Sequence, residues 1–599
     1  MADLDDGSAA TPPPPVGMGD PPPLTARLRH KLTTRDGWLG NYNYAALCTP
    51  RLPCFSVGVA APFFSINQSL PLVVGALVGL QHALAMVGGI TALPLILSGG
   101  GDNHLNLDAE MRAYMVSAAL ITSGLLSIIQ IKRIRLGFRG LQLGSGLISL
   151  SGPSFTFLPI AEAAIAAMRA DGTTCPPPLP SGFPAPCPAA FGRYIGTVAV
   201  CSLLEMAISF LPSRVMRKIV PPIVSGVTVF LIGVSLVGTG LKYWGGGSGP
   251  CFGFRTTGAG PPIFAECPST LVPQTSLPWG DSQWLGLGFS VFGAILFIEV
   301  FGSPFLRSAQ ILVALLFGFA IAAATGFVGT GPITSAPVFT FLWVERFPLG
   351  FYAPSVIPLL IAFVVTSIES VGDITASCDA SRVETSGPEY DSRIQGGILA
   401  DGLNSLLAVL MTGNPNTTFS QNNAVISITR CANRVAGYWA CFWLLLGGIL
   451  GKVGGVFVSI PDAVVGGMTT FLFANVAVSG IRILGRLPWT RRDRFIISSA
   501  LAIGLGVSLV PNWFSFVFTY SGPSAATRAI IEAVEITVGT GYCIGALIAI
   551  VLNLLLPMEV EDLVAPDEPD AAVKSIDMDD SGEDVAVGPD VPAESSSST

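Results

Sequence analysis

Apolar segments recur from residue 72 to residue 556, and they constrain the fold of this 599-residue chain more than any other feature. Several run for about 20 residues or more, the length that a helix needs to cross a bilayer. We count fourteen segments: 72–98, 113–131, 143–168, 194–211, 219–241, 285–301, 308–329, 355–377, 394–412, 418–436, 438–456, 462–481, 495–511 and 533–556. The sequence therefore predicts an all-α polytopic membrane protein with fourteen transmembrane spans. Gly and Pro interrupt spans 3 and 10, which we expect to be broken, with short extended segments.

Composition agrees with a membrane protein. Charged residues make up only 12% of the chain and hydrophobic residues 50%, whereas about 25% charged residues is usual in soluble domains. The tail after Pro557 holds 13 acidic residues and one Lys, and the rest of the chain carries a net charge of +4. This balance argues against a soluble enzyme and gives no reason to expect a nucleic-acid partner. The sequence contains neither a nucleophile–base set nor a cofactor motif that would indicate an enzyme.

Lys and Arg gather in the loops that follow even-numbered spans, which predicts that these loops are cytosolic. They are Lys132, Arg133, Arg135, Arg139, Arg214, Arg217, Lys218, Arg482, Arg486, Arg491, Arg492 and Arg494. Both termini are then cytosolic. We expect a Pro-rich cytosolic segment over 1–62, a transmembrane domain over 63–557 with halves at about 63–330 and 350–557, and an acidic disordered tail over 558–599.

Two cysteine pairs fall in loops on the external side. Cys175 and Cys187 share the loop after span 3, and Cys251 and Cys267 share the loop after span 5. Disulfides are favoured in an oxidising compartment, but free thiols in flexible loops are an equal alternative for each pair. The chain has only three His, and no Cys or His spacing is typical of a metal site, so we expect no metal.

Two local similarities relate the halves of the chain. Spans 5 and 12 share the pattern Gly-x-x-x-Phe-Leu, which begins at Gly226 and at Gly467. Span 3 is broken at Gly152–Phe155, and span 10 begins near Gly413–Pro415. Each similarity pairs a span with the span seven positions later, which indicates a 7+7 repeat whose second half is inverted. Inverted repeats with broken helices at matching positions are typical of transporters that bind their substrate at mid-membrane.

Polar side chains inside apolar spans are expensive and usually functional. Span 1 carries Gln81 and His82, span 8 carries Glu369 and Asp373 on one helix face, and span 9 carries Asp401. The alternative for each is a buried polar network that only locks helices together. We expect such a structural role for three other carboxylates: Glu162, Glu205 and Glu299.

A run of amides, Gln421, Asn422 and Asn423, opens the predicted helix of span 10. Amides offer donors and acceptors together, beside backbone N–H groups that are free at a helix start. This combination suits a flat, neutral or weakly anionic heterocycle with amide-like donors and carbonyls. Phe155, at the matching break of span 3, could stack on the face of such a ring.

The run Gln421–Arg430 (QNNAVISITR) resembles the signature of the nucleobase–ascorbate transporter family. The following Cys431–Arg434 (CANR) is similar to the fungal urate–xanthine permeases of that family, and residues 79–86 and 368–377 also resemble that branch. The likeness covers about residues 63–557. It implies fourteen spans in a 7+7 inverted fold, a core domain that moves against a gate domain, and a homodimer formed through the gate domains.

The resemblance also implies roles for matching residues. Gln421 and Glu369 would hydrogen-bond the edge of a purine ring, and Phe155 would stack on it. Main-chain groups near Ser154 and Ala376 would add contacts. The residues implied in the site network and in specificity are Gln81, His82, Asp373, Asn422, Asn423, Thr429 and Arg430. Proton coupling is assigned to Asp401, Asp373 and Glu369. One departure is that Ala424 replaces the Gly that is usual in the signature; we expect the added methyl group to reduce helix flexibility without abolishing binding.

These expectations together predict a plasma-membrane importer of oxidised purines, xanthine and uric acid, with the proton as coupling ion and no other cofactor. Its expected partners are the purine, membrane lipid and a second copy of the chain. The alternatives are a transporter of uracil, hypoxanthine, guanine or ascorbate, and, from another class, a purine receptor that does not transport. The signature of the ascorbate branch has Pro-Asn in place of Gln-Asn-Asn.

Lys574 is the only Lys after Lys452, and it lies in the acidic tail. It is a candidate for ubiquitylation, and the nearby Glu559–Asp562 could recruit a ubiquitin-ligase adaptor. The resemblance supports this prediction, since related fungal permeases are removed from the surface through such tails. The alternative is a solubilising tail whose Lys is incidental.

Overall fold

The structure is a computed structural model, and it describes residues 32–50, 62–101, 103–137, 140–179, 184–211, 221–247, 266–267, 277–510, 513–514, 517–518, 522 and 524–557. Every element described below lies in the compact unit that ends at Leu556. The predictions for Arg139, Arg214–Lys218, Cys251 and Lys574 fall outside the described residues.

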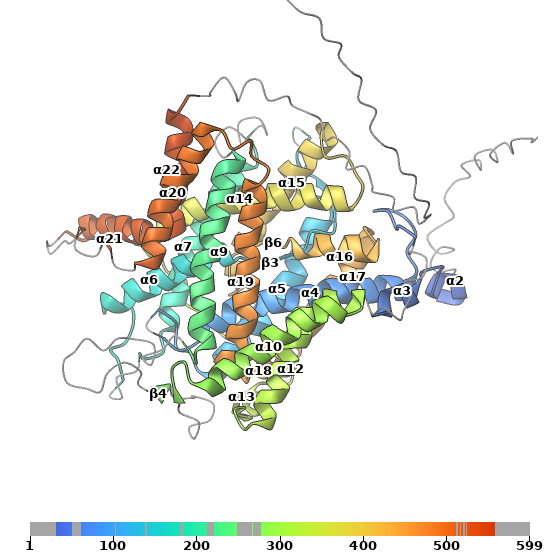
Figure 1. The fold of residues 1–599 in the computed structure, drawn as a ribbon, viewed down its shortest axis with the longest axis horizontal. Helices are drawn as coiled ribbons and strands as arrows, with labels where there is room; N and C mark the ends of the chain where they lie inside the picture. Colours follow the sequence, from blue (N-terminus) through green and yellow to red (C-terminus); the bar gives the residue numbers. More distant parts are fainter. Residues whose placement is uncertain are drawn as a thin grey trace, which may run out of the picture. The chain divides into compact units, whose positions relative to one another are not determined.

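Helices make up most of the described chain (Figure 1). Those of the first half are α2 (Arg35–Trp38), α3 (Tyr44–Cys48), α4 (Leu72–Ser98), α5 (Ala109–Ile131), η1 (Phe155–Phe157), α6 (Leu158–Ala170), α7 (Pro188–Ile208), α9 (Pro222–Trp244), α10 (Ser282–Phe301), α11 (Pro304–Ser308), α12 (Gln310–Ala324) and α13 (Gly331–Ser335). Those of the second half are η3 (Ala353–Ser355), α14 (Val356–Ala380), α15 (Pro388–Leu410), α16 (Gln421–Thr429), α17 (Arg434–Ile449), α18 (Gly451–Val458), α19 (Asp462–Leu484), α20 (Arg491–Leu509), α21 (Ala525–Gly539) and α22 (Gly541–Leu555). The strands are short: β1 (Ile134–Arg135), β2 (Gln142–Leu143), β3 (Ser151–Pro153), β4 (Glu266–Cys267), β5 (Leu277–Pro278) and β6 (Asn416–Thr418).

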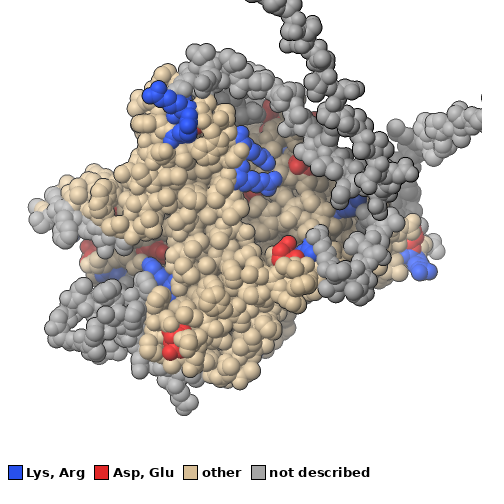
Figure 2. Space-filling view, in the orientation of Figure 1, with Lys and Arg blue, Asp and Glu red and all other residues tan. Residues whose placement is uncertain are grey.

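The predicted helical membrane fold is confirmed. Among the described residues, seven helices are long and apolar enough to cross a membrane, and the pair α21 and α22, bent by 87°, is an eighth candidate. Figure 2 shows a face that is mostly uncharged, with a few small patches of Lys and Arg and of Asp and Glu. Each of the fourteen predicted segments overlaps at least one helix, but several of these helices are too short to span by themselves. The number fourteen therefore stays a prediction.

The helices that carry the repeated Gly-x-x-x-Phe-Leu pattern, α9 and α19, lie side by side (Figure 1). They run antiparallel, because Gly226 faces Leu484 at one end and Gly240 faces Thr470 toward the other. A Cβ atom added at Gly233, between these points, would lie 2.2 Å from the backbone nitrogen of Ala477. The backbones therefore approach so closely that a side chain has no room. Antiparallel packing of these two helices is what inversion of the two halves requires.

A two-stranded sheet joins the two predicted break points. β3 pairs antiparallel with β6, in the register Ser151 with Thr418 and Pro153 with Asn416. The backbone N–H of Ser154 extends the pairing by donating to the carbonyl oxygen of Pro415 at 2.9 Å. The short helices η1 and α6 follow β3, and α16 follows β6, so the two helix starts lie beside one small sheet (Figure 1). The pairing satisfies backbone groups that an interrupted helix leaves free inside a membrane.

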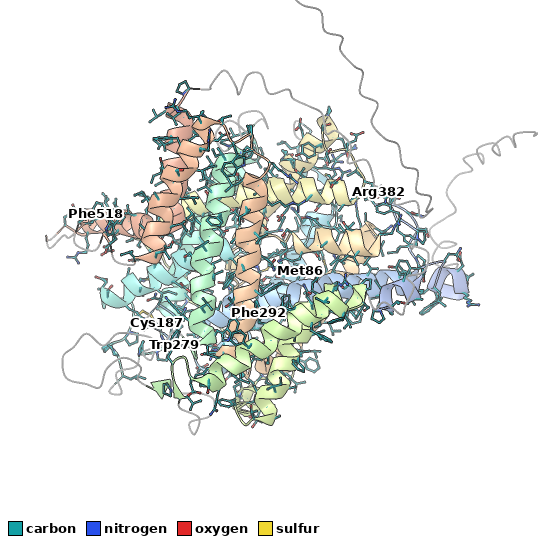
Figure 3. All side chains as sticks on the ribbon, in the orientation of Figure 1. Met86, Cys187, Trp279, Phe292, Arg382 and Phe518 are labelled. Carbon is teal, nitrogen blue, oxygen red and sulfur yellow. A yellow bond between two sulfur atoms is a disulfide. The ribbon has the colours of Figure 1, made fainter. Side chains whose placement is uncertain are left out.

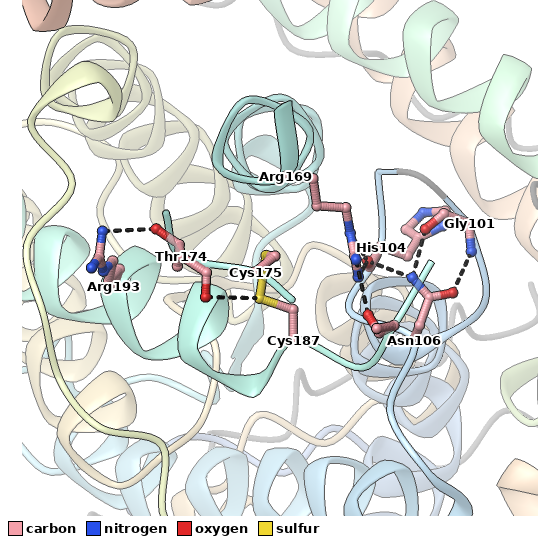
Figure 4. Close-up of a disulfide and its surroundings, with 9 residues drawn as sticks. Gly101, His104, Asn106, Arg169, Thr174, Cys175, Cys187 and Arg193 are labelled. Carbon is pink, nitrogen blue, oxygen red and sulfur yellow. Dashed lines mark hydrogen bonds between the residues drawn. A yellow bond between two sulfur atoms is a disulfide. The ribbon is translucent and has the colours of Figure 1, made fainter. Parts of the chain in front are cut away.

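One of the two cysteine pairs forms a disulfide in the structure. Cys175 and Cys187 are joined between α6 and α7, with their Cα atoms 5.3 Å apart (Figure 4). Next to the disulfide, Nη1 of Arg193 donates to Oγ1 of Thr174 at 2.7 Å. For the second pair, Cys251 lies outside the described residues, and only the backbone of Cys267 is described, at the end of β4.

The N-terminal segment contains structure that its Pro-rich composition does not predict. Within residues 32–50, the short helices α2 and α3 begin after Thr34 and Asn43, whose side chains accept hydrogen bonds from backbone N–H groups of the first turn. The hydroxyl group of Tyr42 donates to the carbonyl oxygen of Thr429 at 3.2 Å. The segment therefore packs on the end of α16.

Candidate functional site

The start of α16 presents Gln421 on an open side of the protein. Gln421 is exposed, whereas Asn422, the next residue, is fully buried. Among the described residues, the Gln421 amide has no hydrogen-bond partner, and Ser420 at the N-cap makes no side-chain cap. The backbone N–H groups of Asn422 and Asn423 are not free as predicted, because they donate to the carbonyl oxygens of Phe419 at 3.4 Å and of Ser420 at 3.0 Å.

Glu369, on α14, lies against the break of span 3. Oγ1 of Thr156 in η1 donates to both carboxylate oxygens of Glu369, at 3.3 Å each. Thr156 is itself anchored, because its carbonyl oxygen accepts a hydrogen bond from the hydroxyl of Tyr542 at 2.8 Å. Sequence reasoning missed Thr156, although it directly follows Phe155 in the recognised break.

Phe155 packs against both of the buried apolar clusters of the fold. Its ring is in edge-to-face contact with Phe473 of α19, with centroids 5.1 Å apart and an interplanar angle of 86°. Phe155 is only half-buried, while Phe473 is completely buried. This geometry fixes the predicted stacking residue between the broken span and α19. The sequence contained no signal that marked Phe473 as a neighbour of Phe155.

His82 and Asn422 are in direct contact. Nδ1 of His82 lies 3.0 Å from Oδ1 of Asn422, and both side chains are completely buried. The Asn422 amide also donates to the carbonyl oxygen of Phe419 at 3.2 Å and to Sδ of Met86 at 3.3 Å. Met86 is labelled in Figure 3. The side chain of Gln81, the neighbour of His82, does not join this contact and instead donates to Oγ of Ser308 in α11 at 3.2 Å.

Asp373 belongs to a second group of polar contacts. Oγ1 of Thr418 donates to its carboxylate at 3.0 Å, and the Asn423 amide donates to its main-chain carbonyl at 3.3 Å. Oδ1 of Asn423 accepts in turn from Ser377 at 2.6 Å. The single network implied for Asp373, His82 and Asn422 is thus two separate sets of hydrogen bonds among the described residues. One ties α16 to α4, and the other ties α16 and β6 to α14.

Asp401, on α15, is completely buried. Its Oδ2 atom accepts hydrogen bonds from Ser370 at 2.6 Å and from Thr417 at 3.0 Å. Thr417 and Thr418 are consecutive residues of β6, so this strand contacts both Asp401 and Asp373. Among the described residues, no ion pair includes Asp373, Asp401 or Glu369.

Four other predicted residues lie at the edges of this region. Thr429 bonds within its own helix, to the carbonyl oxygen of Val425 at 2.7 Å. Arg430 ends α16 in a left-handed conformation, with φ 54°. Both therefore lie at the far end of α16 from Gln421. Ser154 is buried with its hydroxyl unpaired among the described residues, and Ala376 is half-buried on α14.

No group of three or more His, Cys, Asp or Glu side chains in the described part of the chain is arranged to hold a metal ion. The side chains described above are amides, carboxyl groups, hydroxyl groups, the His82 imidazole and the Phe155 ring. Such a set recognises a ligand by hydrogen bonds and stacking.

Two solved structures align with most of the chain. The transmembrane domain of a cyanobacterium bicarbonate transporter, BicA, aligns with a TM-score of 0.48 at 15% identity, over 75% of this chain and 99% of that chain. The murine Slc26a9 anion transporter in its inward-facing state aligns with a TM-score of 0.48 at 10% identity, over 78% of this chain and 67% of that chain.

Sequence comparison gives much stronger matches. A "Purine permease" of Emericella nidulans is 45% identical over 91% of this chain and 92% of its own length. A "Uric acid-xanthine permease" of the same organism is 43% identical over 90% of this chain and 91% of its own length. The "Xanthine permease XanP" of Escherichia coli is 33% identical over 80% of this chain and 91% of its own length. Residues 75–272 and 261–513 match the Permease family, Xan_ur_permease. The resemblance seen in the sequence is confirmed, and the chain belongs to this permease family as a multi-pass membrane protein.

Proposed function

We propose that this chain imports xanthine and uric acid across the plasma membrane together with protons. The names of its relatives support purines as the substrate class. The observation that carries the proposal is that α16, with a free, exposed amide at Gln421, packs on α14, where Thr156 holds the carboxylate of Glu369 in place. Xanthine and urate present ring N–H groups beside carbonyl oxygens. A carboxylate accepts from a ring N–H, while an amide both donates to a carbonyl and accepts from an N–H.

Proton coupling is the second part of the proposal. Glu369, Asp373 and Asp401 have no cationic partner among the described residues, and ionised carboxylates without partners are unfavourable inside a membrane. Moving them across the bilayer is less costly when they carry protons. Uptake is therefore expected to rise as the external pH falls, and Asp401→Asn is expected to flatten that response.

The contacts of the site favour an elevator-type movement. Hydrogen bonds join α4, α14, α15, β3, β6 and α16 to one another through the residues described above. The contacts outward include hydrogen bonds from Gln81 to α11, from Tyr243 of α9 to Ile96 and from Tyr542 of α22 to Thr156. Phe155 adds a ring contact with α19. We infer that the first group of elements moves as one body against α9, α10, α12 and α19, and that the protein works as a homodimer.

The test is uptake of radiolabelled xanthine in cells that lack their own purine permeases. Unlabelled xanthine and urate should compete, whereas uracil and ascorbate should not, and a protonophore should abolish accumulation. Hypoxanthine and guanine belong in the same panel, because they define the width of the pocket. Binding of xanthine without accumulation would favour a receptor. Uptake that needs sodium and ignores both pH and protonophore would contradict proton coupling.

A further inference from the structure

A second carboxyl group lies against Asp401. Glu205 is on α7 and Asp401 is on α15, and both side chains are completely buried. The helices α7 and α15 pack against each other, and α14 donates hydroxyl groups to both side chains. The backbones are also close, because a Cβ atom added at Gly402 would lie 3.2 Å from Cβ of Glu205.

Hydroxyl groups bind the outer side of each carboxyl group. Thr366 and Ser367 of α14 donate to Oε1 of Glu205, at 3.2 and 3.4 Å. Oδ2 of Asp401 accepts from Ser370 and Thr417, as described above. Within the described residues, Oε2 of Glu205 and Oδ1 of Asp401 have no N–H or hydroxyl donor. One oxygen on each carboxyl group is therefore left for the contact between the two acids.

Glu205 and Asp401 could hydrogen-bond each other only with a proton on one of them, because an ionised carboxylate only accepts. Their surroundings provide no substitute for that proton. The charged groups that face the pair are Glu369 and Asp373 of α14, which are themselves acidic. Like charges in contact inside a low-dielectric region cannot both stay ionised. The pair therefore holds one proton in this conformation.

Hydroxyl groups also connect the pair with the candidate purine site. Oγ of Ser370, which donates to Asp401, lies 3.5 Å from Oγ1 of Thr418. Thr418 in turn donates to Asp373 at 3.0 Å. A hydroxyl passes a proton on by accepting one while it releases its own, so that Ser370 and Thr418 end unchanged. In a full transfer, one O–H bond breaks at Asp373 and one forms at Asp401.

We propose that Glu205 and Asp401 together store the transported proton, and that Ser370 and Thr418 connect this store with the purine site. The inference rests on proton-coupled purine import as proposed above, and it adds a residue, Glu205, for which the sequence alone indicated a structural role. Glu205 is a proton-holding residue that does not touch the purine. Its loss should therefore separate proton movement from purine binding.

The test uses the full-length protein reconstituted in vesicles with a pH-sensitive dye inside. Glu205→Gln keeps the size and the ability to donate a hydrogen bond toward Asp401 but cannot carry the proton. Proton entry per xanthine should fall by about tenfold or more, while xanthine binding and xanthine–xanthine exchange stay within about twofold of the wild type. Glu205→Asp should retain coupling. Glu299→Gln makes the same change at an exposed carboxyl group on α10 and should behave like the wild type.

A Glu205→Gln protein that moves protons and accumulates xanthine like the wild type would overturn the inference. Parallel loss of binding, exchange and proton entry would also overturn it, because that pattern indicates a structural role. If Glu205→Gln does not reach the membrane, Ser370→Ala and Ser370→Thr give the answer. Only the first removes the hydroxyl, so equal coupling in the two variants contradicts the proposed path.

An infrared measurement separates this inference from the proposed function. The purified wild type should show the absorption of a buried protonated carboxyl group near neutral pH without any purine, and Glu205→Gln should lose it. A wild type without that absorption would contradict the shared proton even if purine import is established. A wild type that shows it but transports no purine would instead contradict the proposed function.

Discussion

Nδ1 of His82 lies 3.0 Å from Oδ1 of Asn422, and this buried contact joins α4 to the first turn of α16. Asn422 directly follows Gln421, the residue that we expect to meet the purine. Since the Asn422 amide also bonds Phe419 and Met86, the direction in which Gln421 points depends on a fully bonded neighbour. A site held in this way is preorganised, because its supporting shell fixes the side chain that binds.

Asn422→Ala should lower the stability of the protein. The change leaves His82 buried with an unpaired ring nitrogen, which costs about 1–3 kcal/mol. The melting temperature of the detergent-solubilised protein should fall, as measured by fluorescence-detected size-exclusion chromatography. Ser427→Ala is the control on the same helix, because its exposed hydroxyl bonds only its own helix, at Asn423. Equal melting of the two variants would contradict a supporting role for Asn422.

Gln421→Ala should lower the affinity for the purine and leave the stability of the protein unchanged. Gln421 is exposed and makes no hydrogen bond among the described residues, so the melting temperature should not change. Purine groups left unpaired should lower affinity about tenfold or more. The measurement is the inhibition constant of unlabelled xanthine, with surface protein quantified in parallel. Wild-type affinity in this variant would show that the purine binds elsewhere.

Gly233→Ala should destabilise the contact between α9 and α19. The new Cβ would lie 2.2 Å from the backbone nitrogen of Ala477, so the helices must separate, at a cost of about 1–3 kcal/mol for such overpacking. Gly238→Ala is the matched control, because it lies on the same helix with nothing within 4 Å of the added atom. Thermal unfolding should show a lower midpoint for the first variant only. Indistinguishable midpoints would argue against close packing of the repeat-related helices.

Removal of the disulfide should destabilise the loop between α6 and α7. Cross-links that close short loops contribute about 2–4 kcal/mol, so wild-type protein should melt earlier in the presence of a reducing agent. The double variant Cys175→Ser/Cys187→Ser should melt early with or without it. Cys48→Ser, which removes an exposed free thiol, should keep the wild-type response. An unchanged melting temperature in the double variant would contradict a stabilising cross-link.

The sequence predicted most elements of the fold because apolar runs directly record membrane burial. The predicted segment 72–98 coincides with α4, and the predicted segments 219–241 and 462–481 lie within a few residues of α9 and α19. The breaks were visible because Gly and Pro cannot continue a buried helix without new partners. The helices within residues 32–50 were missed, because they are short and depend on capping side chains and on contacts with α16.

Pairings between side chains were the part that the sequence could not predict. Polar residues inside spans stand out individually, but their partners lie on elements far away in the chain. The proximity of Glu205 to Asp401 depends on the close approach of α7 and α15 at Gly402, which no local pattern encodes. Phe473 was missed for the same reason, since only the packing of α19 brings it to Phe155.

The pairing of β3 with β6 also has a consequence for biosynthesis. Ser151 finds its partner only when Thr418 has been made, and at about 5–20 residues per second that delay is roughly ten to fifty seconds. Until then, the backbone groups of β3 in the broken third span lack their partners in β6. The first half of the nascent chain therefore depends on the insertion machinery for longer than an unbroken helix does. A slow stretch of translation between the two strands would prolong the exposure of this chain to quality control.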